Sequence, residues 1–276
     1  MEPAVMETRQ PLFVEEIARG GRFEFGRNWQ KFLKHLNGKR IALAEQSLQK
    51  MLGSASLAGQ TFLDVGCGSG LFSLAARRLG ARVYSFDYDS QSVACARFLK
   101  DKFFPQDDQW IIGQGSVLDR AYLGSLGQHD VVYSWGVLHH TGAMWEALAN
   151  VVPLVKPGGW LFIAIYNDQG WVSRYWNWVK RQSNAGPLRR WLLMLLHWPY
   201  FVGLRLLVRT LSGKGAPRRG MSLWYDMRDW LGGYPFEVAK PQEIVGFFAC
   251  KGFIQQKVKT CGHRQGCNEY VFSRSG

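Results

Sequence analysis

Short apolar runs alternate with segments of helical periodicity through the middle of the chain. Five runs are continuous enough to predict strands, at about 61–65, 82–86, 109–113, 130–135 and 159–166. Segments between them repeat apolar residues every three or four positions and predict helices at about 70–79, 90–103 and 143–152. Because apolar strands separated by helices are buried on both faces, the pattern predicts a parallel α/β sheet.

The chain on either side of this core has a different pattern. Residues 28–52 predict two helices separated near Gly38. Residues 167–240 interrupt the alternation and predict helices at about 170–182 and 188–211, the second kinked at Pro199. A helix and an antiparallel hairpin are expected next, at 241–252, 253–260 and 268–274. We therefore expect four regions: an N-terminal helical cap (1–57), a core (58–166), a helical lid insertion (167–240) and a C-terminal part of the core sheet (241–276).

The sequence FLDVGCGSGLFS, residues 62–73, joins the first predicted strand to its helix. Glycines stand at alternate positions, Gly66, Gly68 and Gly70, so the backbone can turn tightly and a ligand can approach it closely. A dinucleotide-binding turn has the spacing G-x-G-x-x-G or -A, whose third small residue would stand where this chain has Leu71. The spacing G-x-G-x-G therefore favours another class of ligand.

Three more segments follow in an order that suits one known family. They are VYSFDYD at 83–89, DVVYSWGVLHH at 130–140 and LVKPGGWLFIAIY at 154–166. Together with the glycine turn they resemble the motifs of class I S-adenosylmethionine (SAM) methyltransferases, and in particular the small-molecule O-methyltransferases of the ubiquinone-biosynthesis type. The resemblance implies a doubly wound, Rossmann-like sheet of seven mostly parallel strands with an antiparallel last strand, and makes 58–166 the SAM-binding core.

This resemblance also assigns parts of SAM to residues at the strand ends. Asp64 would accept hydrogen bonds from the cofactor's amine. Asp87 would accept both ribose hydroxyls, because an ionised carboxylate is acceptor-only. Tyr88 would lie against adenine. The turn would contact the amino-acid and ribose end through Gly66, Cys67, Gly68 and Gly70.

The expected adenine contacts depart from the family pattern. Many relatives have an acidic residue where this chain has Ser116, so the Ser116 hydroxyl and the Val117 amide would serve adenine here. Asp119 either compensates for the missing acid or caps the following helix. On the other side of the cofactor, Trp135 would pack beside the methionine portion and Trp29 would shield it.

The acceptor side is expected at the ends of the fourth and fifth strands, since ligands bind at the carboxyl ends of parallel strands. His139 and His140 stand where the family's substrate-side residues lie, and an imidazole can accept a proton near neutral pH. The sequence does not decide which of the two would act, and a structural role is the alternative. Further acceptor contacts are expected from Tyr166, Asn167, Arg219 and Trp230, although surface ion pairing would also explain the arginine.

The net charge of +13 is concentrated in one region. Between residues 170 and 240 there are twelve Lys or Arg, three acidic residues and seven Trp. Such a stretch is either a surface for an anionic or interfacial partner or a helical cap whose tryptophans form its own core. Within it, the apolar run 191–204 is shorter than the roughly 20 residues that span a bilayer, which leaves lid packing and an interfacial helix as alternatives.

Cysteine usage and the N-terminal sequence bear on the compartment. The five cysteines are scattered without a C-x-x-C pair, so neither a zinc site nor any other metal site is expected. The first residues contain two glutamates and no apolar stretch of the secretory type. We expect a cytoplasmic protein that is either free or peripheral to the membrane.

These observations predict a SAM-dependent enzyme that methylates a small or amphipathic metabolite, with in-line transfer to oxygen favoured. A nucleic-acid (RNA) methyltransferase is the first alternative, but the chain has WGVLHH where an N/D-P-P-Y/F motif would be expected after the fourth strand. A methyltransferase that acts on a lipidic acceptor at the membrane surface is the second. Neither the acceptor nor the oligomeric state can be derived from the residues.

Overall fold

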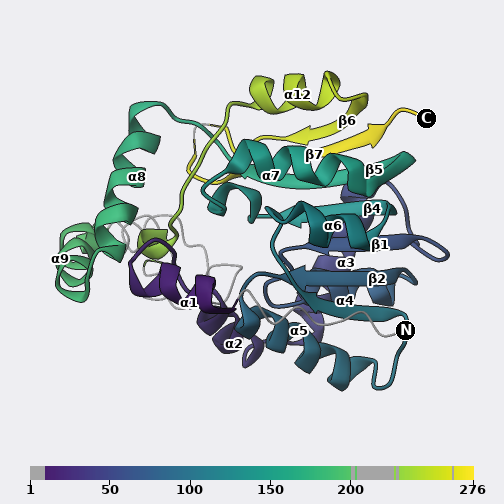
Figure 1. Cartoon of the computed structure of the whole chain (residues 1–276), viewed down its shortest axis with the longest axis horizontal. Coiled ribbons are helices and arrows are strands. Elements are labelled where there is room, and N and C mark those ends of the chain that lie inside the picture. The colour runs from purple at the N-terminus through teal and green to yellow at the C-terminus, as the bar shows by residue number, and fades with distance from the viewer. Residues whose placement is uncertain (1–9, 200–202, 204–226, 228–229, 263) are drawn as a thin grey trace.

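A computed structural model describes residues 10–199, 203, 227, 230–262 and 264–276 of the chain. Seven strands form one sheet in the order β3-β2-β1-β4-β5-β7-β6 (Figure 1). The strands are β1 Thr61–Val65, β2 Arg82–Asp87, β3 Trp110–Gln114, β4 His129–Trp135, β5 Val155–Tyr166, β6 Phe253–Lys259 and β7 Cys267–Arg274. Strands β1 to β5 pair in parallel, and β7 runs antiparallel to both β5 and β6. The predicted fold class is confirmed.

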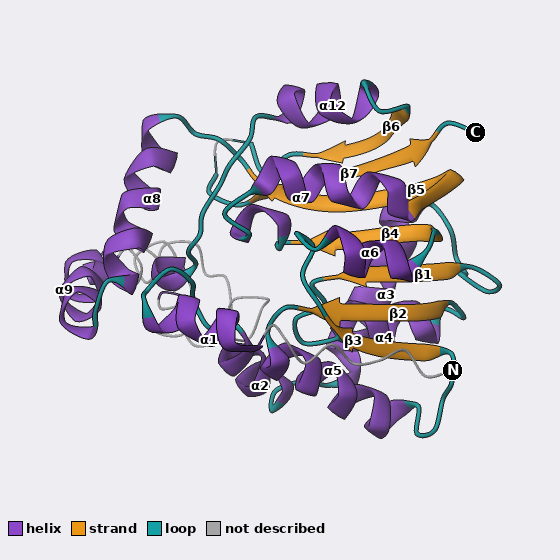
Figure 2. Ribbon diagram, viewed as in Figure 1, coloured by secondary structure: helices purple, strands orange, loops and turns teal. Residues whose placement is uncertain are grey.

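Helices cover both faces of this sheet, as Figure 2 shows. One face packs against α3 Gly38–Leu52, α4 Leu71–Arg78 and α5 Ser90–Phe103, with Leu48, Leu74 and Leu99 in its core. The other packs against α6 Arg120–Leu126, α7 Met144–Val151 and α12 Pro241–Ala249, with Leu123, Leu148 and Phe248 in its core. Because apolar side chains are removed from water on both sides, each central strand reads as a continuous apolar run.

The remaining described helices lie beyond the carboxyl ends of the parallel strands. They are α1 Gln10–Ala18, α2 Gly26–Leu33, α8 Trp171–Asn184 and α9 Pro187–Trp198, and two short 3₁₀ turns, η1 Leu138–His140 and η2 Val152–Leu154, flank α7. Helices α8 and α9 pack on each other around a third apolar cluster that includes Trp176, Leu193 and Phe236. The predicted helix at 188–211 is observed over α9, and its continuation lies outside the described residues, as does Arg219.

Three local features were not expected from the sequence. Helix α5 begins at Ser90, and its N-cap is Asp89, whose carboxylate accepts the Gln91 amide at 2.8 Å. Strand β5 begins at Val155 and not at 159, because Val155 pairs with His129 before the Pro-Gly-Gly segment bulges and pairing resumes at Trp160. Helix α1 was not predicted from its short sequence.

Asp119 has the capping role that was one of its two alternatives. Its carboxylate accepts hydrogen bonds from the amides of Ala121 and Tyr122 at the start of α6.

Among the described helices, none is long and apolar enough to cross a membrane.

Candidate active site

The glycine turn between β1 and α4 has the shape that its spacing predicts. Gly66, Gly68 and Gly70 have φ values of 77°, 53° and 78°, in the left-handed region that favours glycine. A Cβ atom on Gly66 would lie 2.3 Å from the side chain of Val137, and one on Gly68 would lie 3.0 Å from the ring of Trp29. Both the conformation and the close packing therefore require glycine at Gly66 and Gly68.

Asp87 fixes this turn from the end of β2. One carboxylate oxygen accepts the Gly68 amide at 2.9 Å, and the other accepts the Asp89 amide at 2.9 Å. A carboxylate has about four acceptor positions, so each oxygen can still accept from a ligand hydroxyl. Burial raises the pKa of Asp87 to about 6, although its backbone hydrogen bonds oppose the rise.

Asp64 lies deeper, at the end of a buried chain of hydrogen bonds. The Trp110 indole donates to Ser85, Ser85 donates to Ser73, and Ser73 donates to the Asp64 carboxylate at 2.5 Å. All the donors in this chain point toward the carboxylate, so it is the final acceptor. Burial raises the pKa of Asp64 to about 7, and the nearby Asp87 adds to the rise, while the Ser73 hydroxyl lowers it. The site therefore favours a cationic ligand.

Tyr88 connects the carboxyl ends of β1 and β2, which we call the cofactor edge, to the N-terminal segment. Its ring packs edge-on against Phe13 of α1 at 5.2 Å between centroids, and the Arg22 guanidinium lies over the same ring at 5.2 Å. The Arg22 guanidinium also donates to the carbonyl oxygens of His140, at 2.9 Å, and Thr141. One side chain thus links the residue after Asp87 to the loop after β4.

The other residues predicted to contact SAM lie at this same edge, and they differ in the hydrogen bonds and contacts that they already make within the protein. Trp29 lies against Gly68, and Trp135 ends β4 beside the apolar core. The Ser116 hydroxyl accepts the Leu118 amide at 3.2 Å, which leaves its proton available to a ligand. Val117 is buried, and its carbonyl accepts from Asn150. These residues end β4, follow β3 or lie against the glycine turn, at the carboxyl edge of the sheet.

The two histidines of η1 are held in opposite tautomers. His139 Nδ1 accepts the Tyr166 amide at 3.3 Å, so in the neutral ring the proton is on Nε2, which has no partner among the described residues. His140 Nδ1 faces the Pro235 carbonyl at 2.5 Å and must donate to it, so its Nε2 carries the lone pair. Burial lowers the pKa of both rings, to about 3 for His140.

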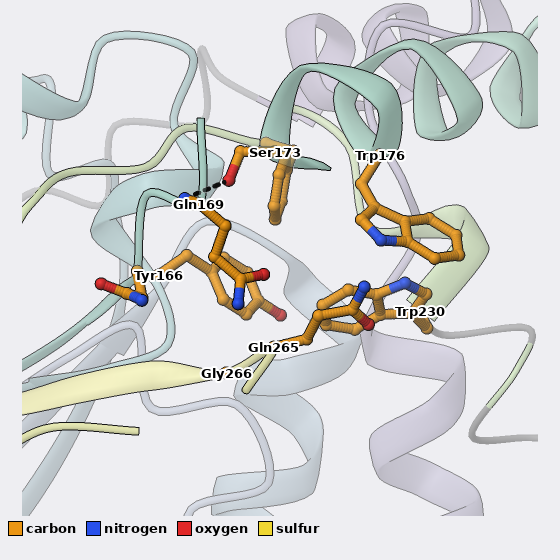
Figure 3. Close-up of a pocket in the computed structure, with 9 residues that line it drawn as sticks. Tyr166, Gln169, Ser173, Trp176, Trp230, Gln265 and Gly266 are labelled. Atoms are coloured by element: carbon orange, nitrogen blue, oxygen red, sulfur yellow. Dashed lines mark hydrogen bonds between the residues drawn. The ribbon is translucent and has the colours of Figure 1, made fainter. Parts of the chain in front are cut away.

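A small pocket opens beside these histidines at the end of β5 (Figure 3). Aromatic side chains form part of its wall, the Gln169 amide lies beside the Tyr166 ring, and the Gln265 amide lies beside Trp230. The Tyr166 ring also packs 4.1 Å from the His139 ring, between centroids. The lining residues are Tyr166, Asn167, Gln169, Ser173, Trp176, Trp230, Phe236, Gln265 and Gly266.

The predicted acceptor residues are thus only partly brought together. Tyr166 and Trp230 share the pocket, with ring centroids 5.8 Å apart. Asn167 lines it too, but its amide donates to the Gly262 carbonyl and accepts from Asn268, which ties it to the β6–β7 hairpin. No described group of three or more His, Cys, Asp or Glu side chains could hold a metal ion.

Several residues of the site were missed by reasoning from sequence. Ser73 and Ser85 carry the hydrogen bonds to Asp64, yet buried serines in a helix and a strand give no local signal. Arg22 and Pro235 act on the histidine loop from positions more than 90 residues away in the chain. Asp89 accepts the Gly26 amide at 2.8 Å and so anchors α2; its position two residues after Asp87 was the available signal.

A family model described as a methyltransferase domain matches residues 32–213, more than half of the chain. The chain therefore belongs to this methyltransferase family, and its fold and motifs place it in the class I, SAM-dependent group.

Individual relatives are more distant. The chain is 33% identical over 137 residues to a ubiquinone biosynthesis O-methyltransferase of Burkholderia multivorans, and the aligned region covers 50% of this chain and 54% of that protein. It is 32% identical over 113 residues to the protein of the same name in Burkholderia cenocepacia, covering 41% and 47%. The match thus spans about half the length of these curated relatives.

Solved structures share the fold at low identity. Magnesium protoporphyrin IX methyltransferase from Synechocystis PCC 6803, with bound S-adenosylhomocysteine (SAH), is 17% identical with a TM-score of 0.55, covering 95% of this chain and 100% of that one. The 1,6-didemethyltoxoflavin-N1-methyltransferase of Burkholderia thailandensis is 13% identical with a TM-score of 0.55, covering 99% and 94%. These likenesses show the fold alone.

The residues at the carboxyl edge fit SAM. A buried carboxylate with a raised pKa at Asp64 suits the cofactor's positive charge, and the two oxygens of Asp87 retain acceptor positions for hydroxyls. Glycine at positions 66 and 68 lets the turn pack closely against Val137 and Trp29. The chain therefore has the fold and the cofactor-side residues of a SAM-dependent methyltransferase.

Proposed function

We propose that this enzyme transfers a methyl group to a hydroxyl oxygen of a small or amphipathic metabolite. The observation that carries the proposal is the position of the pocket at Tyr166, next to the histidine loop and at the same sheet edge as Asp64 and Asp87. The O-methyltransferase names of the two Burkholderia relatives support oxygen as the acceptor atom. A neighbour named as an N1-methyltransferase has the same fold, so the fold alone does not select the atom.

Asp87, Asp64 and the glycine turn would hold the cofactor. Asp87 accepts the ribose hydroxyls, Asp64 faces the amine, and the turn from Gly66 to Gly70 lies along the ribose and the amino acid. Tyr88 and Ser116 serve adenine, and Trp29 and Trp135 enclose the methionine part. When bound, SAM supplies an electrophilic methyl group on a cationic sulfur, so the chemistry depends mainly on alignment and on exclusion of water.

The two histidine rings would have different roles, because their tautomers differ. An O–CH₃ bond forms as the S–CH₃ bond breaks, and the hydroxyl proton must leave the acceptor. His140 Nε2 carries a lone pair and can accept that proton, whereas His139 Nε2 carries hydrogen and can only donate. With a pKa of about 3, His140 is a weak base, so alignment contributes more to the rate than proton transfer does.

The acceptor would lie between the aromatic rings of Tyr166 and Trp230, with the Gln169 and Gln265 amides available to its polar groups. An aromatic wall suits a flat or partly apolar molecule. Arg219 remains a predicted contact, since it lies outside the described residues. The apolar surroundings also suit an amphipathic acceptor presented at a membrane surface.

The test is transfer of labelled methyl from SAM to matched acceptors. We would offer phenols with and without an alkyl tail, the corresponding anilines, and transfer RNA. The proposal predicts a labelled methyl ether from phenols and no label in RNA. Label in the anilines alone would overturn the assignment to oxygen, and label in RNA alone would revive the nucleic-acid alternative.

A further inference from the structure

Two helices next to the acceptor pocket expose apolar side chains along one stripe each. On α8, exposed residues recur at helical spacing as Trp171, Arg174, Tyr175, Trp178 and Arg181. On α9, the corresponding exposed residues are Leu188, Trp191, Leu192 and Leu195. We refer to these nine residues as the α8–α9 face. The opposite sides of the same helices are buried in the cluster around Trp176 and Leu193.

The exposure of this face is unlike that of a solvated helix. Trp171 is 71% exposed, Leu188 70% and Leu195 60%. Single exposed apolar residues are common on protein surfaces, but a gathering of large ones on adjacent helices marks a site of interaction. Figure 1 shows the two helices projecting beyond the end of the sheet, where a large flat partner can reach them.

The charged residues of the two helices have one sign. No acidic residue occurs in the sequence between Asp168 and Asp226. Arg174 and Arg181 alternate with the aromatic residues on α8, and Arg189 and Arg190 lie in the first turn of α9. Long basic side chains beside tryptophans are typical of helices that lie in the interface of an anionic bilayer.

We propose that the α8–α9 face docks onto the surface of a membrane that contains anionic phospholipids. Helix α9 has 12 residues, too few to span a bilayer, so it lies in the plane of the headgroups with its leucines inserted. A second copy of the chain suits the face less well, because two copies would bring arginines together. Nucleic acid suits it less well because leucines give bases no stacking surface.

The same helix connects this face to the pocket. Ser173 and Trp176 of α8 line the pocket, while Trp171, Tyr175 and Trp178 point outward from the same turns. A docked protein would therefore hold its acceptor pocket close to the headgroups. This part rests on the proposed function: an acceptor whose apolar tail stays in the bilayer could place its hydroxyl in the pocket.

The experiment is flotation with lipid vesicles. The full chain is mixed with vesicles of phosphatidylcholine alone, or of phosphatidylcholine with phosphatidylglycerol, and the floated fraction is measured at low and high salt. A Trp191→Glu/Leu195→Glu variant tests the face. The matched control is Phe98→Glu/Ile254→Glu, which adds the same charge at two apolar residues that are 53% and 56% exposed elsewhere.

We expect the wild type and the control to float with anionic vesicles, less at high salt, and the face variant to bind about tenfold more weakly or worse. No flotation of the wild type, or equal loss in both variants, would overturn the proposal. So would a concentration-dependent dimer that the face variant abolishes in the absence of flotation. SAH titration of each variant keeps the outcomes separate: retained SAH binding without flotation rejects the docking and leaves the methyltransferase assignment intact.

Discussion

The cofactor edge and the acceptor side of this enzyme are built in different ways. At the cofactor edge, backbone amides and buried carboxylates fix each other through short hydrogen bonds, as Asp87 does with Gly68. On the acceptor side, Tyr166, Trp230 and Phe236 meet through ring packing, and much of α8 and α9 faces outward. The first arrangement is suited to one constant ligand, and we expect that side chains of the second can be exchanged without disturbing the first.

The largest effect is expected where the cofactor edge is most tightly packed. Gly66→Ala should destabilise the fold by about 3 kcal/mol, because it combines left-handed strain with overpacking against Val137. Gly59→Ala is the matched control, since Gly59 has the same φ of 77° with no atom within 4 Å of the added Cβ. It should cost about 1 kcal/mol in chemical denaturation. Equal losses in the two variants would show that Val137 does not constrain the turn.

Asp87→Asn should weaken SAH binding about 100-fold, because one carboxylate oxygen is replaced by an NH₂ group that can accept neither a ribose hydroxyl nor the backbone amide that this oxygen held in the turn. Asp119→Asn is the control, since Asp119 caps α6 outside the cofactor edge. Isothermal titration distinguishes the two. An unchanged affinity for SAH in Asp87→Asn would show that the Asp87 carboxylate does not bind the ribose.

The binding of SAH should fall about tenfold or more between pH 8 and pH 5.5. The pKa values of Asp64 and Asp87, about 7 and 6, lie above the usual value of 3.8, so acidification protonates the carboxylates that the ligand requires in ionised form. Ser73→Ala should move the midpoint to higher pH, because the donor that lowers the pKa of Asp64 is lost. Ser134→Ala, at a buried serine that donates to the Val65 carbonyl, should leave the midpoint unchanged. A flat pH profile in the wild type would contradict this role for the two acids.

The smallest effect is expected at the link between the two regions. Arg22→Met should lose about 1–2 kcal/mol of stability and should also lose the protection that SAH gives to amides of the 137–142 loop in hydrogen exchange. Arg19→Met provides the control, because Arg19 is exposed and pairs only with Glu15 among the bonds described. Equal protection of the loop in both variants would show that Tyr88 and the histidine loop respond independently.

The same contrast explains what the sequence could predict. Gly66, Asp87 and the strand β1 lie in local patterns whose spacing is itself the signal, so the fold and the glycine turn could be predicted from the sequence. The tautomers of His139 and His140 depend on Tyr166 and Pro235, and the state of Asp64 depends on Ser73. Those partners meet only after the strands are assembled, and nothing in the local sequence of the histidines or of Asp64 indicates them.

The central claim concerns how the cofactor sits at the carboxyl ends of β1 and β2. A crystal structure of the enzyme with SAH bound tests it directly. The account predicts both ribose hydroxyls within hydrogen-bonding distance of the Asp87 carboxylate and the amino group of SAH on the side of Asp64. SAH bound elsewhere on the sheet, or with its ribose turned away from Asp87, would contradict it.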